Sequence, residues 1–151
     1  MSLDLKDCFL ATPMATHKYM KIRFSILPSD IVQRYNLQHK QTPDGYVCIR
    51  IKKEMYGLKE AAVLAYNQLT EFLNKEGYCH VQGTSGLWTH VTKPTAFYLC
   101  INDIGLKYYN KTDLQHFIST ISKHYDYCID NTGENYMGFK IKWNYAKGYV
   151  D

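Results

Sequence analysis

The alternation of hydrophobic and polar residues predicts one strand and two helices with particular clarity. From residue 46 to 52 apolar side chains fall at every second position, which is the period of a strand with one buried face. From 59 to 76 they recur at helical spacing, and a glycine follows directly as a stop signal. A second helix is expected to begin with Thr112 as its N-cap and to bury a stripe that includes Phe117.

Shorter apolar runs predict the remaining strands. One is expected at residues 3–10, ending at a Thr-Pro pair, and another at about 136–143. Between them, runs at 97–101 and 104–109 flank the polar pair Asn102-Asp103, which is typical of a tight hairpin. The less regular stretch after residue 13 is expected to hold a strand at 19–24, a helix at 29–35 and a polar loop at 42–45.

The order of these elements predicts an α+β fold. When residues 14–55 are set aside as an insertion, the order is strand, helix, strand, strand, helix, strand. That is the split βαβ order of ferredoxin-like domains, in which two helices cover one face of an antiparallel sheet. The order does not define a function, because RNA-binding modules, metal carriers and polymerase palms share it.

Composition narrows the class of protein. The 151 residues suit about one domain, and the net charge of +4 fits a polyanionic partner but is also common among soluble proteins. Five cysteines without a C-x-x-C pair indicate neither a disulfide framework nor a zinc ribbon. No long apolar run or cleavage-site pattern is present, so the chain is expected to be intracellular, in cytoplasm or nucleus, and not in a membrane.

Acidic residues mark the candidate chemistry. In the predicted sheet, Asp4 and Asp7 at the end of the first strand would lie near Asn102 and Asp103 in the central hairpin. Paired carboxylates that bridge Mg²⁺ ions are the usual device for nucleotidyl transfer. Residue types alone favour a plainer interpretation, in which Asp103 is an ordinary turn residue and Asp4 is a solvated edge residue.

Two segments favour the metal-binding interpretation over this plainer one. The segment Asp4-Leu5-Lys6-Asp7-Cys8-Phe9-Leu10 resembles the first palm motif of reverse transcriptases, where an aspartate is followed five residues later by an aromatic residue that blocks the ribose 2′-hydroxyl. Asp4 and Phe9 match these positions. The segment Met55-Tyr56-Gly57-Leu58-Lys59-Glu60-Ala61 is similar to the L-Y-G-L-K-Q-A element of copia-type retrotransposon polymerases, which contacts the incoming nucleotide and the template.

Two further segments extend the resemblance. Residues 98–104 stand where that family carries its Y-V-D-D hairpin, and residues 135–141 are similar to the strand that grips the primer end. The four elements follow the family order from Asp4 to about Trp143. The resemblance therefore implies a palm at 1–13 and 56–151 and a partial fingers insertion at 14–55, within a reverse transcriptase-like domain whose family activity is RNA-directed DNA polymerisation.

The resemblance also implies roles for individual residues. Asp4 and Asp103 would bind Mg²⁺ or Mn²⁺, with Asn102 in a substituted catalytic position. The partners would be an RNA or DNA template-primer, a deoxynucleoside triphosphate, and the remainder of a retroelement polyprotein. The nucleotide-contacting positions would be Phe9, Tyr56, Gly57, Leu58, Lys59 and Glu60, and the primer grip would be Met137, Gly138 and Phe139.

Departures from the family pattern predict weakened catalysis and a weakened or lost metal. Asn102 replaces a metal-binding aspartate and Cys100 replaces a tyrosine. Glu60 replaces a glutamine and would either bring negative charge near a triphosphate or be an exposed acid in the first turn of a helix, a position that suits it. Part of the fingers and all of the thumb are also expected to be missing. The alternatives are a non-catalytic nucleic-acid-binding module, with a tyrosine-rich sheet and phosphate contacts from Lys107, Lys140 and Lys142, and a decayed reading frame with no selected function.

Overall fold

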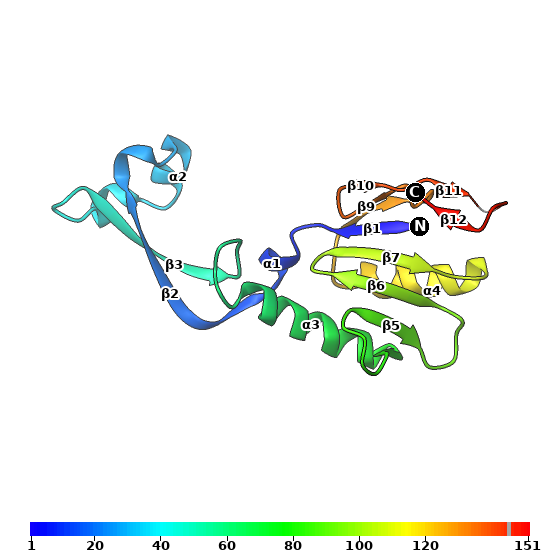
Figure 1. Cartoon of the computed structure of the whole chain (residues 1–151). Helices are drawn as coiled ribbons and strands as arrows, with labels where there is room; N and C mark the ends of the chain where they lie inside the picture. The colour runs from blue at the N-terminus through cyan, green and yellow to red at the C-terminus, as the bar shows by residue number, and fades with distance from the viewer. Residues whose placement is uncertain (145) are drawn as a thin grey trace.

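A six-stranded sheet in which every neighbouring pair is antiparallel forms the larger part of the molecule (Figure 1). The computed structural model describes residues 1–144 and 146–151. In spatial order the strands are β4 (Tyr78–His80), β5 (Leu87–His90), β6 (Ala96–Cys100), β7 (Asp103–Lys107), β1 (Ser2–Leu5) and β8 (Tyr127–Asp130). The helices associated with this sheet are α1 (Cys8–Ala11), α3 (Ala61–Lys75) and α4 (Lys111–Ser122).

One face of the sheet carries the main hydrophobic core. Ile104 on β7 lies opposite both Leu3 on β1 and Leu99 on β6, so these three side chains share a face. They belong to one buried cluster with Leu69 of α3 and Phe117 of α4. Both long helices therefore cover the same face and leave the other face open to its surroundings.

The edge strand beside β1 is not the one that the sequence predicted. β8 occupies this edge, and the strand predicted at 136–143 is wrong. Met137 and Gly138 have φ values of 52° and 78° and reverse the chain there. The segment forms two short hairpins instead, which pair β9 (Asn135–Tyr136) with β10 (Phe139–Lys140) and β11 (Trp143–Asn144) with β12 (Tyr149–Val150).

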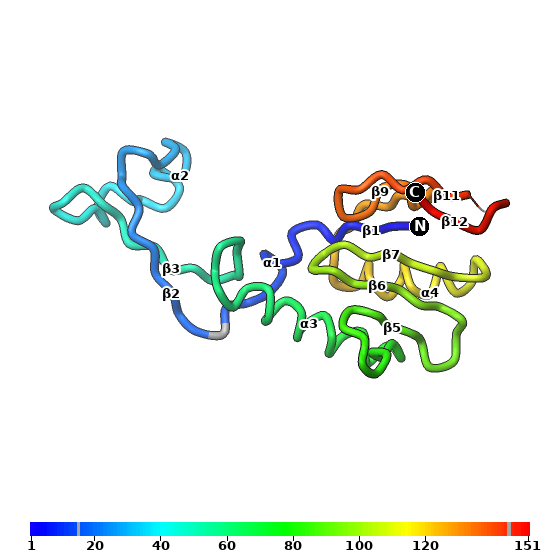
Figure 2. The backbone as a smooth tube through the Cα atoms, viewed as in Figure 1, coloured from blue at the N-terminus to red at the C-terminus, as the bar shows by residue number. Residues whose placement is uncertain are grey.

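The insertion forms a second, smaller unit that projects from the sheet (Figure 2). β2 (Pro13–Arg23) and β3 (Tyr46–Lys53) pair with each other in their own two-stranded sheet. Between them lie η1 (Phe24–Ile26), α2 (Ser29–Arg34) and η2 (Leu37–Lys40). A separate small core contains Val32, Leu37 and Val47. The predictions of a strand at 46–52 and a helix at 29–35 are confirmed, and the strand predicted at 19–24 is part of the longer β2. The sheet of β2 and β3 is separate from the six-stranded sheet.

Three local predictions need correction. The first strand ends at Leu5 rather than residue 10, because Asp7 adopts a φ of 50° and the chain turns into α1. α4 is capped by Asn110, whose side chain accepts a hydrogen bond from the Asp113 N–H, and not by Thr112. The turn of the central hairpin consists of Ile101 and Asn102, since Cys100 pairs with Asp103.

None of the helices in residues 1–144 and 146–151 combines the length and the apolar character needed to cross a bilayer.

Candidate functional site

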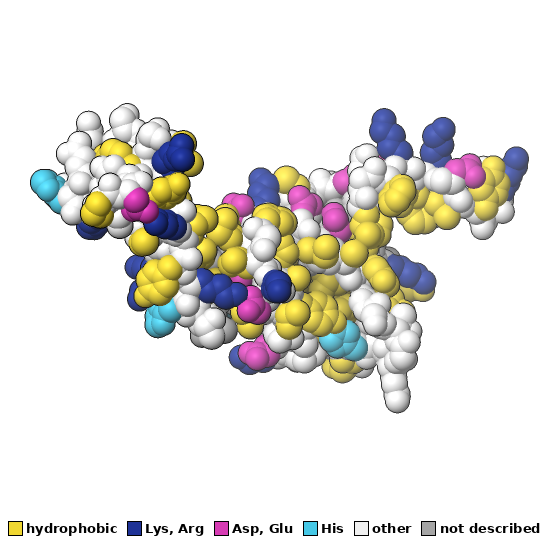
Figure 3. Space-filling model, turned by 60° about the vertical axis from the view of Figure 1, so that its left-hand side comes forward, with side chains coloured by type: hydrophobic (Ala, Val, Ile, Leu, Met, Phe, Trp, Pro, Cys, Tyr) yellow, Lys and Arg dark blue, Asp and Glu magenta, His cyan; other side chains and the backbone are white. Residues whose placement is uncertain are grey.

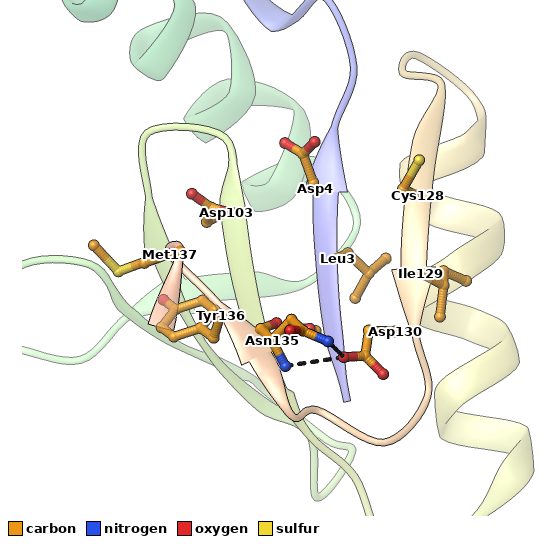
Figure 4. Close-up of a pocket in the computed structure, with 11 residues that line it drawn as sticks. Leu3, Asp4, Asp103, Cys128, Ile129, Asp130, Asn135, Tyr136 and Met137 are labelled. Atoms are coloured by element: carbon orange, nitrogen blue, oxygen red, sulfur yellow. Dashed lines mark hydrogen bonds between the residues drawn. The ribbon is translucent and has the colours of Figure 1, made fainter. Parts of the chain in front are cut away.

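The carboxylates of Asp4 and Asp103 lie on neighbouring strands at the centre of the sheet. Asp4 on β1 is the direct cross-strand partner of Asp103 on β7. Their neighbours Leu3 and Ile104 are buried in the core, so the two-residue period places both acids on the open face. Residues that are directly opposite in an antiparallel pair have Cβ atoms about 4.5–5.5 Å apart. The expected proximity of these residues is found, and Figure 4 shows both side chains beside the same pocket.

The acidic pair changes the protonation behaviour of its surroundings. Partial burial, and then the charge of Asp4, raise the pKa of the Asp103 carboxyl above its ordinary value. Burial and the charge of Asp4 likewise raise the pKa of the buried Cys8 thiol. Both effects disfavour additional negative charge at this place. A proton or a cation between the acids would therefore relieve unfavourable electrostatic energy.

Asn102 takes a direct part in this cluster. Its side-chain amide donates a hydrogen bond to Oδ1 of Asp4. The amide thus engages one oxygen of a carboxylate that the family resemblance assigns to a metal ion. Within the described part of the chain, no group of three or more His, Cys, Asp or Glu side chains is arranged to hold a metal. Any ion at this site would depend on Asp4 and Asp103, with water as additional ligands.

The β9–β10 hairpin forms one wall of the site. A pocket of about 260 Å³ is bordered by the two acids and by the tip of this hairpin. The hairpin residues at the pocket are Tyr136, Met137 and Gly138, next to Asn135 at its base. Two of the three predicted primer-grip residues are thus brought to the acidic pair. The third, Phe139, is 71% exposed and does not line the pocket.

A second, apolar pocket lies beside the central hairpin turn. It has a volume of about 280 Å³, and Phe9 and Ile101 contribute to its lining. The other lining residues come from the first half of α3 and are Ala62, Val63, Ala65 and Tyr66. Hydrophobic side chains are visible over the middle of the molecule, between its two projecting ends, in Figure 3. Because Ile101 and Asn102 form the same turn, this apolar surface adjoins the acidic pair.

The loop before α3 holds the other predicted nucleotide-contacting residues. Tyr56 is exposed, and its ring meets the ring of Phe9 edge to face with 4.6 Å between centroids. Gly57 has a φ of 91°, which favours glycine, and Leu58 packs against the main core. Lys59 is exposed.

Glu60 is the residue whose electrostatic role differs most from expectation. It precedes α3 and forms an ion pair with Lys18 on β2. The hydrogen bond from Lys18 lowers the pKa of the Glu60 carboxyl. Its negative charge is therefore balanced by the insertion, and it does not stand unpaired beside the nucleotide-contacting loop. The pairing of Lys18 with Glu60 could not be predicted from spacing, because 42 residues separate them.

Sequence reasoning also missed Cys128. This residue lies on β8 directly opposite Asp4 and lines the same pocket. Its own strand, β8, was not predicted, because it has four residues and its sequence shows no regular alternation of apolar and polar side chains. The only signal was a short apolar pair after α4, which did not distinguish a strand from a loop.

Comparisons with known proteins show that the chain is similar to retroelement polyproteins. No family model and no solved structure matches the chain. In an alignment of 108 residues that covers 66% of the chain, it is 30% identical to the Gag-Pol polyproteins of transposons Ty1-DR1 and Ty1-DR5 of Saccharomyces cerevisiae. This similarity supports a retroelement origin. The matched region is 6% of each of these relatives, and 9% of the truncated Ty1-A Gag-Pol polyprotein, which matches to the same extent.

Proposed function

We propose that this retroelement-derived chain is a reverse transcriptase-like domain with RNA-directed DNA polymerase as its family activity and with impaired catalysis. The observation that carries the proposal is the cross-strand pair of Asp4 and Asp103 on the open face of the sheet, beside the tip of the β9–β10 hairpin. The similarity to Gag-Pol polyproteins supports it, since such polyproteins come from retrotransposons.

The proposed fold is a ferredoxin-like polymerase palm with a partial fingers insertion at residues 14–55. Four adjacent strands in the order β6-β7-β1-β8 support it, because a split βαβ unit places its first and third strands in the middle and its fourth strand beside the first. The two connections, through α3 and α4, cover one face and leave the acids on the other. β4 and β5 extend this sheet beyond the four strands.

In the proposed chemistry, a primer 3′-hydroxyl attacks the α-phosphorus of a nucleoside triphosphate and pyrophosphate leaves. Asp4 and Asp103 fit a hard divalent cation such as Mg²⁺ or Mn²⁺, because they supply two carboxylates on one face. A bound cation would supply charge stabilisation to the reacting phosphate. Phe9 would limit the space at the sugar, Tyr56 to Lys59 would contact nucleotide and template, and Met137 and Gly138 would hold the primer end.

Asn102 is the reason for proposing weak catalysis. An aspartate at this position would add a negative charge, whereas the amide adds none and donates a hydrogen bond to Asp4. Loss of one electrostatic stabiliser typically raises a barrier by about 2.7–4 kcal/mol. Metal affinity should fall for the same reason, because hard cations bind more tightly to sites with more carboxylates.

The test is restoration of the metal response by Asn102→Asp. Calorimetric titration with Mg²⁺ and Mn²⁺, and melting curves with and without each ion, should show higher affinity and greater thermal stabilisation than in the original chain. A cation present at 100 times its dissociation constant would stabilise the folded state by about 2.7 kcal/mol. A control that carries Asn102→Asp together with Asp4→Asn should lose the gain. Equal metal responses in all three proteins would refute the proposed site.

A non-catalytic nucleic-acid-binding module is the second candidate, favoured by the distribution of charge. Between residues 13 and 56 there are eight Lys or Arg residues and three Asp or Glu residues, so the insertion is more basic than the whole chain. Basic side chains bind phosphates and release counterions, which makes affinity fall steeply as salt rises. This candidate predicts salt-dependent RNA binding that Asp4→Asn and Asp103→Asn leave undiminished. Binding that depends on these acids and on Mg²⁺ favours the polymerase-like site.

A further inference from the structure

The β9–β10 hairpin is attached to the open face of the sheet by contacts at its base. The ring of Tyr136 lies over Gly105 of β7, and its hydroxyl donates a hydrogen bond to the Tyr98 carbonyl of β6 at 3.3 Å. Ser2 of β1 donates its hydroxyl to the Asn135 carbonyl. The hairpin is thus joined to three neighbouring strands, and its orientation depends on their relative positions.

Gly105 leaves space on the strand under this ring. A Cβ atom at Gly105 would lie 3.4 Å from ring atoms of Tyr136, which is an ordinary van der Waals contact, so only a side chain larger than a methyl group would be expected to move the ring. Gly105 is not among the glycines with positive φ, so its backbone conformation does not itself require glycine. Glycine weakens a strand interior and often marks a place where another group approaches the backbone closely. At this position the approaching group is the Tyr136 ring.

The turn before the hairpin is organised around one carboxylate. Oδ1 of Asp130 accepts hydrogen bonds from the backbone and the hydroxyl of Thr132, and Oδ2 accepts from the backbone and the side-chain amide of Asn135. These bonds hold the pKa of the Asp130 carboxyl far below its ordinary value. Asp130 thereby links the end of β8 to the first residue of β9 in a defined geometry.

We propose that Tyr136, Gly105 and Asp130 are positioning residues, which set the height of the Met137–Gly138 turn above Asp4 and Asp103. The inference rests on the proposed function, in which that turn holds a primer end beside the acidic pair. It adds that contacts at the base of the β9–β10 hairpin determine the position of the turn at its tip. The tip itself lines the pocket that contains both acids, and Met137 there adopts a left-handed backbone conformation. This conformation belongs to the two-residue turn of the β9–β10 hairpin, in which both Met137 and Gly138 have positive φ.

Gly105→Val separates this role from a general contribution to stability. Valine is a better strand former than glycine, so the sheet itself should not weaken. The added methyl groups would displace the Tyr136 ring. Amide hydrogen exchange at Phe139, which pairs with Tyr136, should then accelerate about tenfold or more, while exchange at Ile104 in the central strand stays within about twofold.

Tyr136→Phe is the matched conservative variant. It keeps the ring over Gly105 and removes only the hydroxyl, so hairpin exchange should stay within about threefold of the original. Tyr136→Ala should reproduce the effect of Gly105→Val. Unchanged exchange at Phe139 in Gly105→Val overturns the proposal, as does an equal acceleration at Phe139 and Ile104, because the latter result describes global destabilisation.

A binding measurement tests the link to the proposed function. The probe is a fluorescent RNA–DNA duplex with a recessed 3′ end, compared with a blunt duplex of the same length. The original chain and Tyr136→Phe should prefer the recessed end, and Gly105→Val should reduce that preference about fivefold or more, which is about 1 kcal/mol of binding free energy. A loosened hairpin that leaves the preference intact refutes the positioning role. If the original chain shows no preference for the recessed end, this result counts against the proposed function. The hydrogen-exchange result still decides whether Tyr136 and Gly105 hold the hairpin in place.

Discussion

Replacement of Glu54 by an apolar residue should stabilise the protein. Glu54 follows β3 at the junction between the insertion and the sheet, where its backbone N–H donates to the Thr12 carbonyl. Its side chain is 1% exposed, and among the described residues neither carboxylate oxygen has a hydrogen-bond partner. Buried charged groups without partners are rare, because nothing replaces the water that they lose.

The magnitude follows from this burial. An unsatisfied buried polar group costs about 1–3 kcal/mol, and a charged group costs more. Methionine has a similar unbranched length and no polar atom that requires a donor, so Glu54→Met should raise the free energy of unfolding by about 1–3 kcal/mol. At about 2–4 °C per kcal/mol for a protein of this size, the midpoint of melting should rise by about 2–12 °C. Glu54→Gln should raise the free energy of unfolding by less than Glu54→Met, since the glutamine amide would also lack hydrogen-bond partners.

Urea denaturation at pH 7, followed by circular dichroism, provides the assay. The midpoint should rise while the dependence of the free energy on urea stays unchanged, because the surface exposed on unfolding is nearly the same. Glu71→Met on the exposed side of α3 is the matched control and should change stability by no more than about 0.5 kcal/mol. If Glu54→Met is neutral or destabilising while the control behaves as expected, the Glu54 carboxylate has a stabilising partner and the reasoning is wrong.

Two further predictions concern the core and a pair of histidines, His90 on β5 and His116 on α4. Ile104→Ala removes a fully buried side chain from the central strand and should lower the free energy of unfolding by about 2–5 kcal/mol in the same urea assay. Burial lowers the pKa values of His90 and His116, whose rings lie 5.2 Å apart. The unfolded chain therefore binds protons more readily, so stability should be retained above about pH 6.5 and fall as the pH drops below it. A variant with both histidines replaced by glutamine should show a smaller change in the free energy of unfolding between pH 7.5 and 5. An unchanged slope would mean that other groups cause the pH dependence.

The sequence by itself determined the elements whose signal is local. α3 has apolar residues at helical spacing over fifteen residues, and β3 alternates over eight, so periodicity was enough to predict both. The β6–β7 hairpin was predicted because two apolar runs leave room for only a tight turn. Asp4, Asn102 and Asp103 lie in motifs that can be recognised along the chain without knowledge of the contacts between them.

Tertiary structure decided which short segments join the sheet and what surrounds the acids. β8 and β9 have four and two residues, too few for a period to distinguish strand from loop, so pairing with β1 and docking on Gly105 determine their places. The Lys18–Glu60 ion pair and the Asn102–Asp4 hydrogen bond likewise join residues 42 and 98 positions apart. No local propensity encodes such contacts, because they exist only after burial of the core brings distant strands into register.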